Sequence, residues 1–280
     1  NRSASKFSGA QIYGDAVMAE RNALWRARVR TGFPNNFDPV LVVGSRLKVS
    51  LRTSSLPVRA NGVWMRSQEN VGVEEDVNLT SLMSVHSLDL SFSFGITQVG
   101  ALRDVKELRI ANCQKVSDLS ALGSVDSLTV LNAPLVRDVR YLFGVRKLVL
   151  FNCTGITDVG ALGRVQDLDL SGCNNITDIS ALAMVPKLRI SHCTRISDIG
   201  MLGEVRELNA SGCTGITDVS ALRSVRFLDL AGCTGITDVS ALRSVRSLDL
   251  AGCTGITDVS ALGRVDTLNL TGCTGITNEE

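Results

Sequence analysis

The 280 residues include 29 lysines and arginines against 28 aspartates and glutamates, and this net charge of +1 argues against nucleic acids and membrane surfaces as partners. No apolar run in the sequence approaches the length of a membrane span. Apolar residues make up 44% of the chain and aromatic residues only 4%, so we predict a core of valine, leucine, isoleucine and cysteine.

Residues 1–36 form the first predicted unit, a helical segment. Between positions 11 and 30, apolar side chains are interspersed with charged ones, as in an amphipathic helix, and Phe33 and Pro34 end the pattern. One interpretation is a helix that caps the rest of the chain, with Trp25 packed against the first repeat.

Residues 37–78 form the second predicted unit. Strand-like runs at 40–43, 47–51 and 62–65 are separated by proline and glycine. We expect an irregular β-rich segment that covers the open end of the following core, as repeat proteins require.

Residues 79–280 repeat every twenty positions. Valine fills one column from Val85 to Val265 and leucine another from Leu88 to Leu268, within the pattern V-x-x-L-x-L-x-x-C-x-x-I-T-D-V-x-x-L. Ten in-phase copies indicate an α/β solenoid. Because L-x-L alternates apolar and polar residues, we predict parallel strands at 88–90 and at every twentieth triplet, which form a concave sheet. Short helical turns or bends should form the convex face.

All eight cysteines occupy one column of this pattern. Their even number, and N-x-S/T sequons at Asn78, Asn152, Asn175, Asn209 and Asn269, would fit a disulfide framework in a secreted protein. Because the cysteines recur at the same position of each repeat, we instead expect them to pack in the core as small apolar residues. This predicts buried, reduced thiols and an intracellular protein. The cysteines are Cys113, Cys153, Cys173, Cys193, Cys213, Cys233, Cys253 and Cys273.

A second column carries eight aspartates. Stacked carboxylates are one way to build a metal or acid site, but each of these precedes a V-x-x-L or I-x-x-L run, or its Leu119 equivalent. There a carboxylate accepts the free N–H groups of a helical turn, so we predict N-capping in every repeat. The aspartates are Asp118, Asp138, Asp158, Asp178, Asp198, Asp218, Asp238 and Asp258.

The sequence offers little for catalysis. His86 and His192 are the only histidines, and neighbouring cysteines are twenty residues apart, which is not a metal-binding spacing. Neither a P-loop nor a dinucleotide-binding glycine motif is present. We therefore predict no enzyme, no bound metal and no cofactor.

The concave face is the predicted binding surface, because its outward strand positions flank the buried leucines. Most of these positions are small or charged, but Leu131, Val149 and Phe151 form an apolar group, a candidate contact site. The alternative is that the N-terminal segment folds over this group. The predicted partner-binding residues are Leu131, Lys147, Val149, Phe151, Asp169, Arg189, Phe227 and Asp229.

Six arginines recur on the bends and edge of the later copies. Asp229 and Asp249 follow Arg226 and Arg246 by three residues, so we expect much of this charge to be paired locally. Nucleic-acid binding would need unpaired basic surface with stacking aromatics, and Phe227 is nearly alone there. The arginines are Arg206, Arg223, Arg226, Arg243, Arg246 and Arg264.

Across residues 79–280 the pattern resembles the leucine-rich repeat, L-x-x-L-x-L-x-x-N/C-x-L. Two residues rather than one separate Cys233 from Ile236, which resembles the cysteine-containing subclass found in F-box/leucine-rich-repeat proteins. The ITDVSAL run also resembles repeats of bacterial internalins, which carry asparagine where this chain has cysteine. The resemblance implies a non-enzymatic module that binds a protein through its concave face.

Leu24 and Trp25, followed by Phe33 and Pro34, resemble the closing part of an F-box. This resemblance implies that the four residues bind a Skp1-like adaptor and that the chain presents a target to a ubiquitin ligase. The alternative function is a structural subunit, or scaffold, whose surface is contacted by neighbouring subunits of a large assembly. The near-identity of the copies at Cys213, Cys233 and Cys253 favours it, because a selective surface should diversify.

Residues 265–276 form the last copy, and the capping unit that solenoids ordinarily carry is not evident after it. An apolar edge and an unpaired strand would coincide there. We expect a partner protein or a second copy of the chain to cover this end, unless the natural chain is longer.

Overall fold

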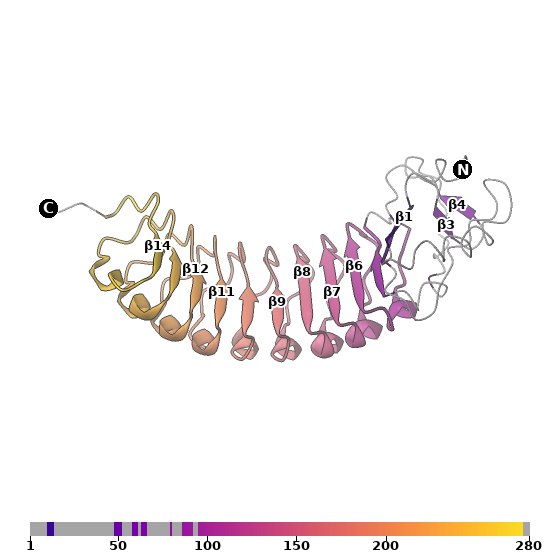
Figure 1. Cartoon of the computed structure of the whole chain (residues 1–280), viewed down its shortest axis with the longest axis horizontal. Helices are drawn as coiled ribbons and strands as arrows, with labels where there is room; N and C mark the ends of the chain where they lie inside the picture. Colours follow the sequence, from indigo (N-terminus) through magenta and orange to yellow (C-terminus); the bar gives the residue numbers. More distant parts are fainter. Residues whose placement is uncertain are drawn as a thin grey trace.

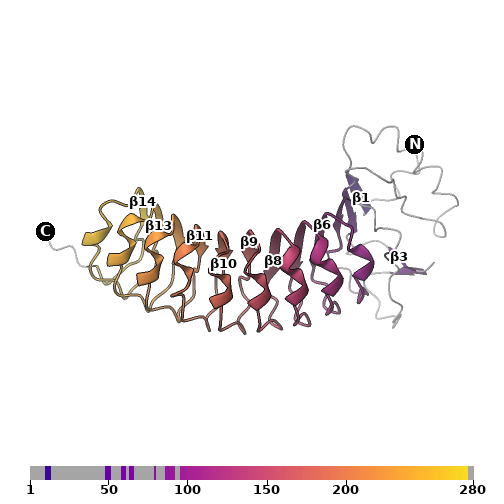
Figure 2. The ribbon, with the colours of Figure 1, turned by 90° about the horizontal axis from the view of Figure 1, so that it is seen from below.

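The computed structural model describes the backbone of residues 10–13, 48–51, 58–60 and 63–65, and residues 79, 86–91 and 95–276 in full. Twelve strands form one sheet in the order β1-β2-β5-β6-β7-β8-β9-β10-β11-β12-β13-β14, which curves into an arc (Figures 1 and 2). Short helical turns line the convex side of this arc.

The repeat strands are three to five residues long, and 3-10 helices alternate with them along the chain. The strands are β5 (Ser87–Asp89), β6 (Glu107–Ala111), β7 (Ser127–Leu131), β8 (Lys147–Phe151), β9 (Asp167–Asp169), β10 (Lys187–Arg189), β11 (Glu207–Asn209), β12 (Phe227–Asp229), β13 (Ser247–Asp249) and β14 (Thr267–Asn269). The helices are η3 (Gly100–Leu102), η4 (Ser120–Ser124), η5 (Arg140–Gly144), η6 (Gly160–Leu162), η7 (Ser180–Leu182), η8 (Leu202–Glu204), η9 (Ser220–Ser224), η10 (Ser240–Ser244) and η11 (Ser260–Leu262).

The ten strands β5 to β14 run parallel with a register of one repeat. Leu188, for example, pairs with Leu168 on one side and Leu208 on the other. The leucine columns point inward and are buried from β5 to β13, and Leu268 and Leu270 at the last strand are half-buried. The residues between them are at least partly exposed, because successive side chains of a strand face opposite ways. The predicted ten-repeat solenoid is confirmed, with strands that begin one residue earlier than expected.

The cysteine column lies in the core and forms a ladder between repeats. All eight cysteines are free and buried, as predicted. Each Sγ donates to the backbone carbonyl 23 residues earlier, at 2.9–3.7 Å; Cys233 Sγ, for example, lies 3.2 Å from the Ala210 oxygen. The column therefore contributes packing and one interrepeat hydrogen bond for each coil.

These thiols should be unreactive in the native protein. Burial raises the pKa of Cys213 and of Cys233 to about 12, so almost no thiolate is present near neutral pH. We expect few of the eight to react with a chromogenic disulfide reagent until denaturant is added. A Ser220→Cys variant, whose new thiol would lie on an exposed turn, provides the reactive control. Rapid native labelling of most thiols would contradict the packing assigned to this column.

The position before each cysteine, and before Ala133 in the same column, adopts left-handed backbone geometry. Asn112, Asn132, Asn152 and His192 have φ between 53° and 59°, and the remaining described copies place glycine there, as at Gly232 with φ 73°. Glycine and asparagine tolerate this region best among common residues. Asn132 and Asn152 also donate through Nδ2 to the asparagine Oδ1 of the preceding repeat, at 2.8 Å each. This position turns the chain from strand to core.

The aspartate column opens the 3-10 turns. In all eight copies Oδ1 accepts the backbone N–H two residues later at 2.8–3.0 Å. In seven copies this N–H belongs to the first residue of a 3-10 helix, as the capping prediction requires, whereas Asp198 bonds Gly200, which precedes η8 by two residues. The backbone N–H of the following serine, and secondarily its hydroxyl, hold the pKa of Asp118, Asp178, Asp218, Asp238 and Asp258 below the ordinary value.

The N-terminal strands add to one end of the sheet. β1 (Ala10–Tyr13) pairs antiparallel with β2 (Lys48–Leu51), which pairs parallel with β5, and β3 (Val58–Ala60) forms a separate hairpin with β4 (Val63–Met65). The helix predicted from residue 11 is wrong at its start, because strand pairing overrides the helical pattern there. The remainder of the predicted helix lies outside the described residues, and the division at 36 and 78 stays a prediction.

Candidate functional site

An apolar group lies where β7 and β8 pair on the concave face. Leu131 is in register with Phe151, and Thr129 with Val149, so the four side chains occupy neighbouring positions on two strands. Phe151 is 43% exposed, while Leu131 and Val149 are half-buried. The alternate positions of both strands are buried leucines and valine, which anchor the backbone. The exposed side chains are therefore held on a fixed support. We call Leu131, Val149 and Phe151 the apolar patch.

Lys147 opens β8 beside this patch. It is exposed and lies in register with Ser127 and Asp167 on the adjacent strands. Its position gives the edge of the apolar patch a positive charge, which suits a partner with a carboxylate beside an apolar side chain.

The middle of the concave face is charged but internally paired. Arg189 Nη1 lies 2.7 Å from Asp167 Oδ1, and Lys187 Nζ lies 2.8 Å from Glu207 Oε2, so each pair links adjacent strands. These partly exposed ion pairs neutralise the charges of Asp167, Arg189, Lys187 and Glu207. Arg189, a predicted partner-binding residue, is consequently engaged within the sheet.

The predicted site residues Asp169 and Asp229 support the backbone turn after their strands. Asp169 Oδ1 accepts the N–H of Ser171 at 2.9 Å, and Asp229 Oδ1 accepts that of Ala231 at 3.0 Å. Asp229 Oδ2 also accepts Asn209 Nδ2 at 2.9 Å. Burial, helped by the nearby Asp249 carboxylate, raises the pKa of Asp229, although the Ala231 N–H opposes this. Both Asp229 oxygens are thus occupied.

The local pairing expected between arginines and Asp229 or Asp249 is wrong. Within the described residues neither carboxylate makes an ion pair; Asp249 Oδ2 instead accepts Asn269 Nδ2 at 3.0 Å. Arg226 immediately precedes β12 and Asp229 ends it. Residues three apart on an extended strand point to opposite faces, so the sequence separation does not bring these charges together.

The other aromatic side chains that the structure describes do not join the apolar patch. Phe227, a predicted site residue, is 48% exposed on β12, where it lies between Glu207 and Ser247. The strands β9, β10 and β11 separate it from Phe151. Tyr141 and Phe143 are exposed on η5, on the convex side rather than on the sheet.

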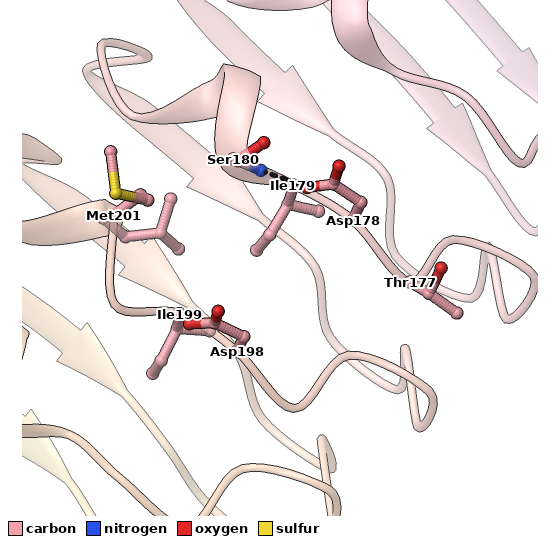
Figure 3. Close-up of a pocket in the computed structure, with 8 residues that line it drawn as sticks. Thr177, Asp178, Ile179, Ser180, Asp198, Ile199 and Met201 are labelled. Atoms are coloured by element: carbon pink, nitrogen blue, oxygen red, sulfur yellow. Dashed lines mark hydrogen bonds between the residues drawn. The ribbon is translucent and has the colours of Figure 1, made fainter.

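A small groove opens between the turns that lead into η7 and η8 (Figure 3). It arises where η8 begins at Leu202, two residues later in the repeat than η7 does at Ser180. Asp178, Asp198 and Met201 contribute to its lining, and its volume of about 190 Å³ is below the range of ordinary ligand pockets. Each carboxylate already accepts a backbone N–H, so the groove is not assigned a ligand.

The described residues contain no group of three or more histidine, cysteine or acidic side chains placed to hold a metal ion. Among the same residues, none of the helices is long and apolar enough to cross a bilayer. The predicted adaptor-binding residues Leu24, Trp25, Phe33 and Pro34 lie outside the described part of the chain. The predicted cover of the patch by the N-terminal segment concerns undescribed residues as well.

Two segments, residues 165–185 and 241–262, match the family model described as the leucine-rich repeat. The fold is a leucine-rich-repeat solenoid. Among solved structures with similarity to this solenoid, an internalin (InlF) of Listeria monocytogenes is 18% identical, with a TM-score of 0.43 over 91% of this chain and 94% of that chain. Internalin C2 of the same species is 19% identical, with a TM-score of 0.44 over 75% and 86%.

The leucine-rich-repeat domain of the type III effector XCV3220 (XopL) is 16% identical to this solenoid, with a TM-score of 0.42 over 62% of this chain and 71% of that one. No curated protein sequence matches the chain.

Proposed function

We propose that this leucine-rich-repeat protein is a non-enzymatic binding module whose partner protein docks on the apolar patch. The carrying observation is the contiguity of Leu131, Val149 and Phe151 on a rigid sheet whose central strands are occupied by paired charges. Aromatic side chains, phenylalanine among them, are enriched at the core of protein–protein interfaces. Lys147 adds a charge at the rim that favours an acidic group in the partner.

Introducing carboxylates into the patch should remove the partner without unfolding the solenoid. In the double variant Val149→Asp with Phe151→Asp, two charges would face the partner's apolar surface, and we expect affinity to fall by about thirtyfold or more. The measurement is a quantitative pull-down from native extract with the full chain, followed by titration of the recovered partner. Circular dichroism melting should show little change, because both positions are outside the core.

Ser247→Asp with Thr267→Asp provides a matched control on β13 and β14, since it adds the same charge to other outward positions. The control should retain the partner. Retention by both double variants would exclude the patch as the docking site. Unfolding of the first variant would instead place its side chains in the core.

A narrower role is that of an F-box-type adaptor for a ubiquitin ligase. It is supported by the Leu24, Trp25, Phe33 and Pro34 resemblance together with the cysteine column, and it requires a Skp1-like protein among the recovered partners.

The competing role is a scaffold within a large assembly, with the last coil covered by a neighbour. It is supported by the similarity of the coils that contain β12 and β13, and by the half-buried Val265, Leu268 and Leu270. Crosslinking with mass spectrometry distinguishes them, since a scaffold would crosslink on both faces.

We also propose an intracellular location. Eight free, buried cysteines suit a reducing compartment. The sequon residue Asn209 lies in β11 and its Nδ2 is bonded to Asp229, so a glycan there would break a contact within the sheet.

A further inference from the structure

Three exposed arginines form a row at the start of neighbouring strands. Arg206, Arg226 and Arg246 directly precede β11, β12 and β13. The Arg226 N–H donates to the Arg206 carbonyl and the Arg246 N–H to the Arg226 carbonyl, at 3.0 Å each. The three backbones therefore lie side by side at the spacing of a sheet, about 4.8 Å. We call these residues the arginine row.

The arginine row has no counterion within the described residues. The ion pairs found there join other groups, including Lys187 with Glu207 and Arg189 with Asp167. Glu207, which follows Arg206 directly, pairs with Lys187, and Asp229 and Asp249 are bonded to backbone N–H groups and asparagine side chains. Glu204, two residues before Arg206, and Asp266, which precedes β14 in the same column, make no ion pair within the described residues. The positive charge of the row is thus available to another molecule.

The bends beside the row add further positive charge. Arg223 lies in the last turn of η9 and Arg243 in the last turn of η10, and each lies three residues before a member of the row. Like charges at matching positions on neighbouring strands repel one another, although the chain as a whole carries only +1. An anionic partner would relieve this repulsion, so the arrangement favours binding over the free state.

We propose that the arginine row binds an acidic segment of a protein partner. Guanidinium groups pair with carboxylates through two parallel hydrogen bonds, and a row of them suits successive acidic side chains. A nucleic acid is less suited, because Phe227 is the sole aromatic side chain in the described residues from 201 to 276 and stacking needs more. This surface is separate from the apolar patch on β7 and β8.

The test uses the full chain and a fluorescein-labelled oligoglutamate peptide. Fluorescence anisotropy at roughly 0.1 M salt should show saturable binding that weakens as salt rises. In the variant Arg206→Gln, Arg226→Gln and Arg246→Gln, we expect affinity to fall about tenfold, because three charge-assisted contacts are lost. The melting temperature should hold, since all three side chains are exposed.

Arg137→Gln, Arg164→Gln and Arg195→Gln form the matched control, with the same loss of net charge at other exposed positions. This control should bind the peptide within about twofold of the parent. An equal loss in both triple variants would overturn the proposal in favour of nonspecific attraction. Tighter binding of a labelled single-stranded oligonucleotide than of the peptide would overturn it in favour of a nucleic acid. Retention of the patch-dependent partner by the arginine variant would separate this surface from the proposed function.

Discussion

Replacing Leu188 by alanine should lower the free energy of unfolding by about 2–5 kcal/mol, the cost of a cavity in a closely packed core. Leu188 is fully buried at the middle of β10, between Leu168 and Leu208 in the adjacent strands. Because a coil in a solenoid contacts only its neighbours, distant parts of the core cannot rearrange to fill the cavity. Urea denaturation followed by circular dichroism measures the change.

Leu268→Ala is the matched control at the last strand. Leu268 occupies the same column but is only half-buried, and within the described residues β14 pairs with β13 alone. Its loss should cost less than about 2 kcal/mol, because part of the side chain is already in water. We also expect the Leu188 variant to unfold in two phases, since the central coil joins two otherwise intact halves. Equal costs at both sites would contradict nearest-neighbour packing.

Replacing Gly232 by valine should cost roughly 1–3 kcal/mol, because the backbone there has φ 73° and a β-branched side chain strongly disfavours that region. The loss would come from the backbone rather than from crowding. A Cβ at this position would meet its nearest neighbours, the Gly212 backbone atoms, at 3.8 Å, which is an ordinary van der Waals contact. Thermal and urea unfolding of the full chain would measure it.

The variant Gly232→Asn tests whether destabilisation at this position comes from the left-handed backbone geometry or from the loss of glycine itself. Asparagine occupies the same column at Asn112, Asn132 and Asn152 with φ between 53° and 58°. Its short polar side chain tolerates the left-handed region, so the expected cost is below about 1 kcal/mol. If asparagine proved as costly as valine, the left-handed position would not account for the residue choice in this column.

The solenoid was predictable because its core columns repeat without interruption. The valine column is buried from Val105 to Val245 and the leucine column from Leu88 to Leu248, so the period of the sequence reports both the strands and their register. The left-handed column was less evident, although the alternation of asparagine and glycine at Asn152 and Gly172 was its signal. The strand β1 (Ala10–Tyr13) was not predicted, because its pairing with β2, which is distant in sequence, outweighs the local helical periodicity.

The candidate site was predictable only in part. Alternation along β7 and β8 placed Leu131, Val149 and Phe151 outward, and the structure brings these three together. The same rule could not show that Asp169 and Asp229 bond their own turns, because side-chain hydrogen bonds depend on rotamers. Phe227 lies on the same concave face but not beside the apolar patch, because the strands β9, β10 and β11 lie between them.

The coil at 213–232 and the coil at 233–252 differ at one position, where Phe227 corresponds to Ser247. If one of these two coils were deleted, the coils on either side of it would still meet the same leucines, cysteines and valines in the same register. A change in the number of coils therefore leaves the packing between coils intact. Deleting or duplicating one whole period removes or adds one set of interfaces, and it creates no mismatched one. The single position that differs points outward, so the length of the array and the chemistry of its surface are free to change independently.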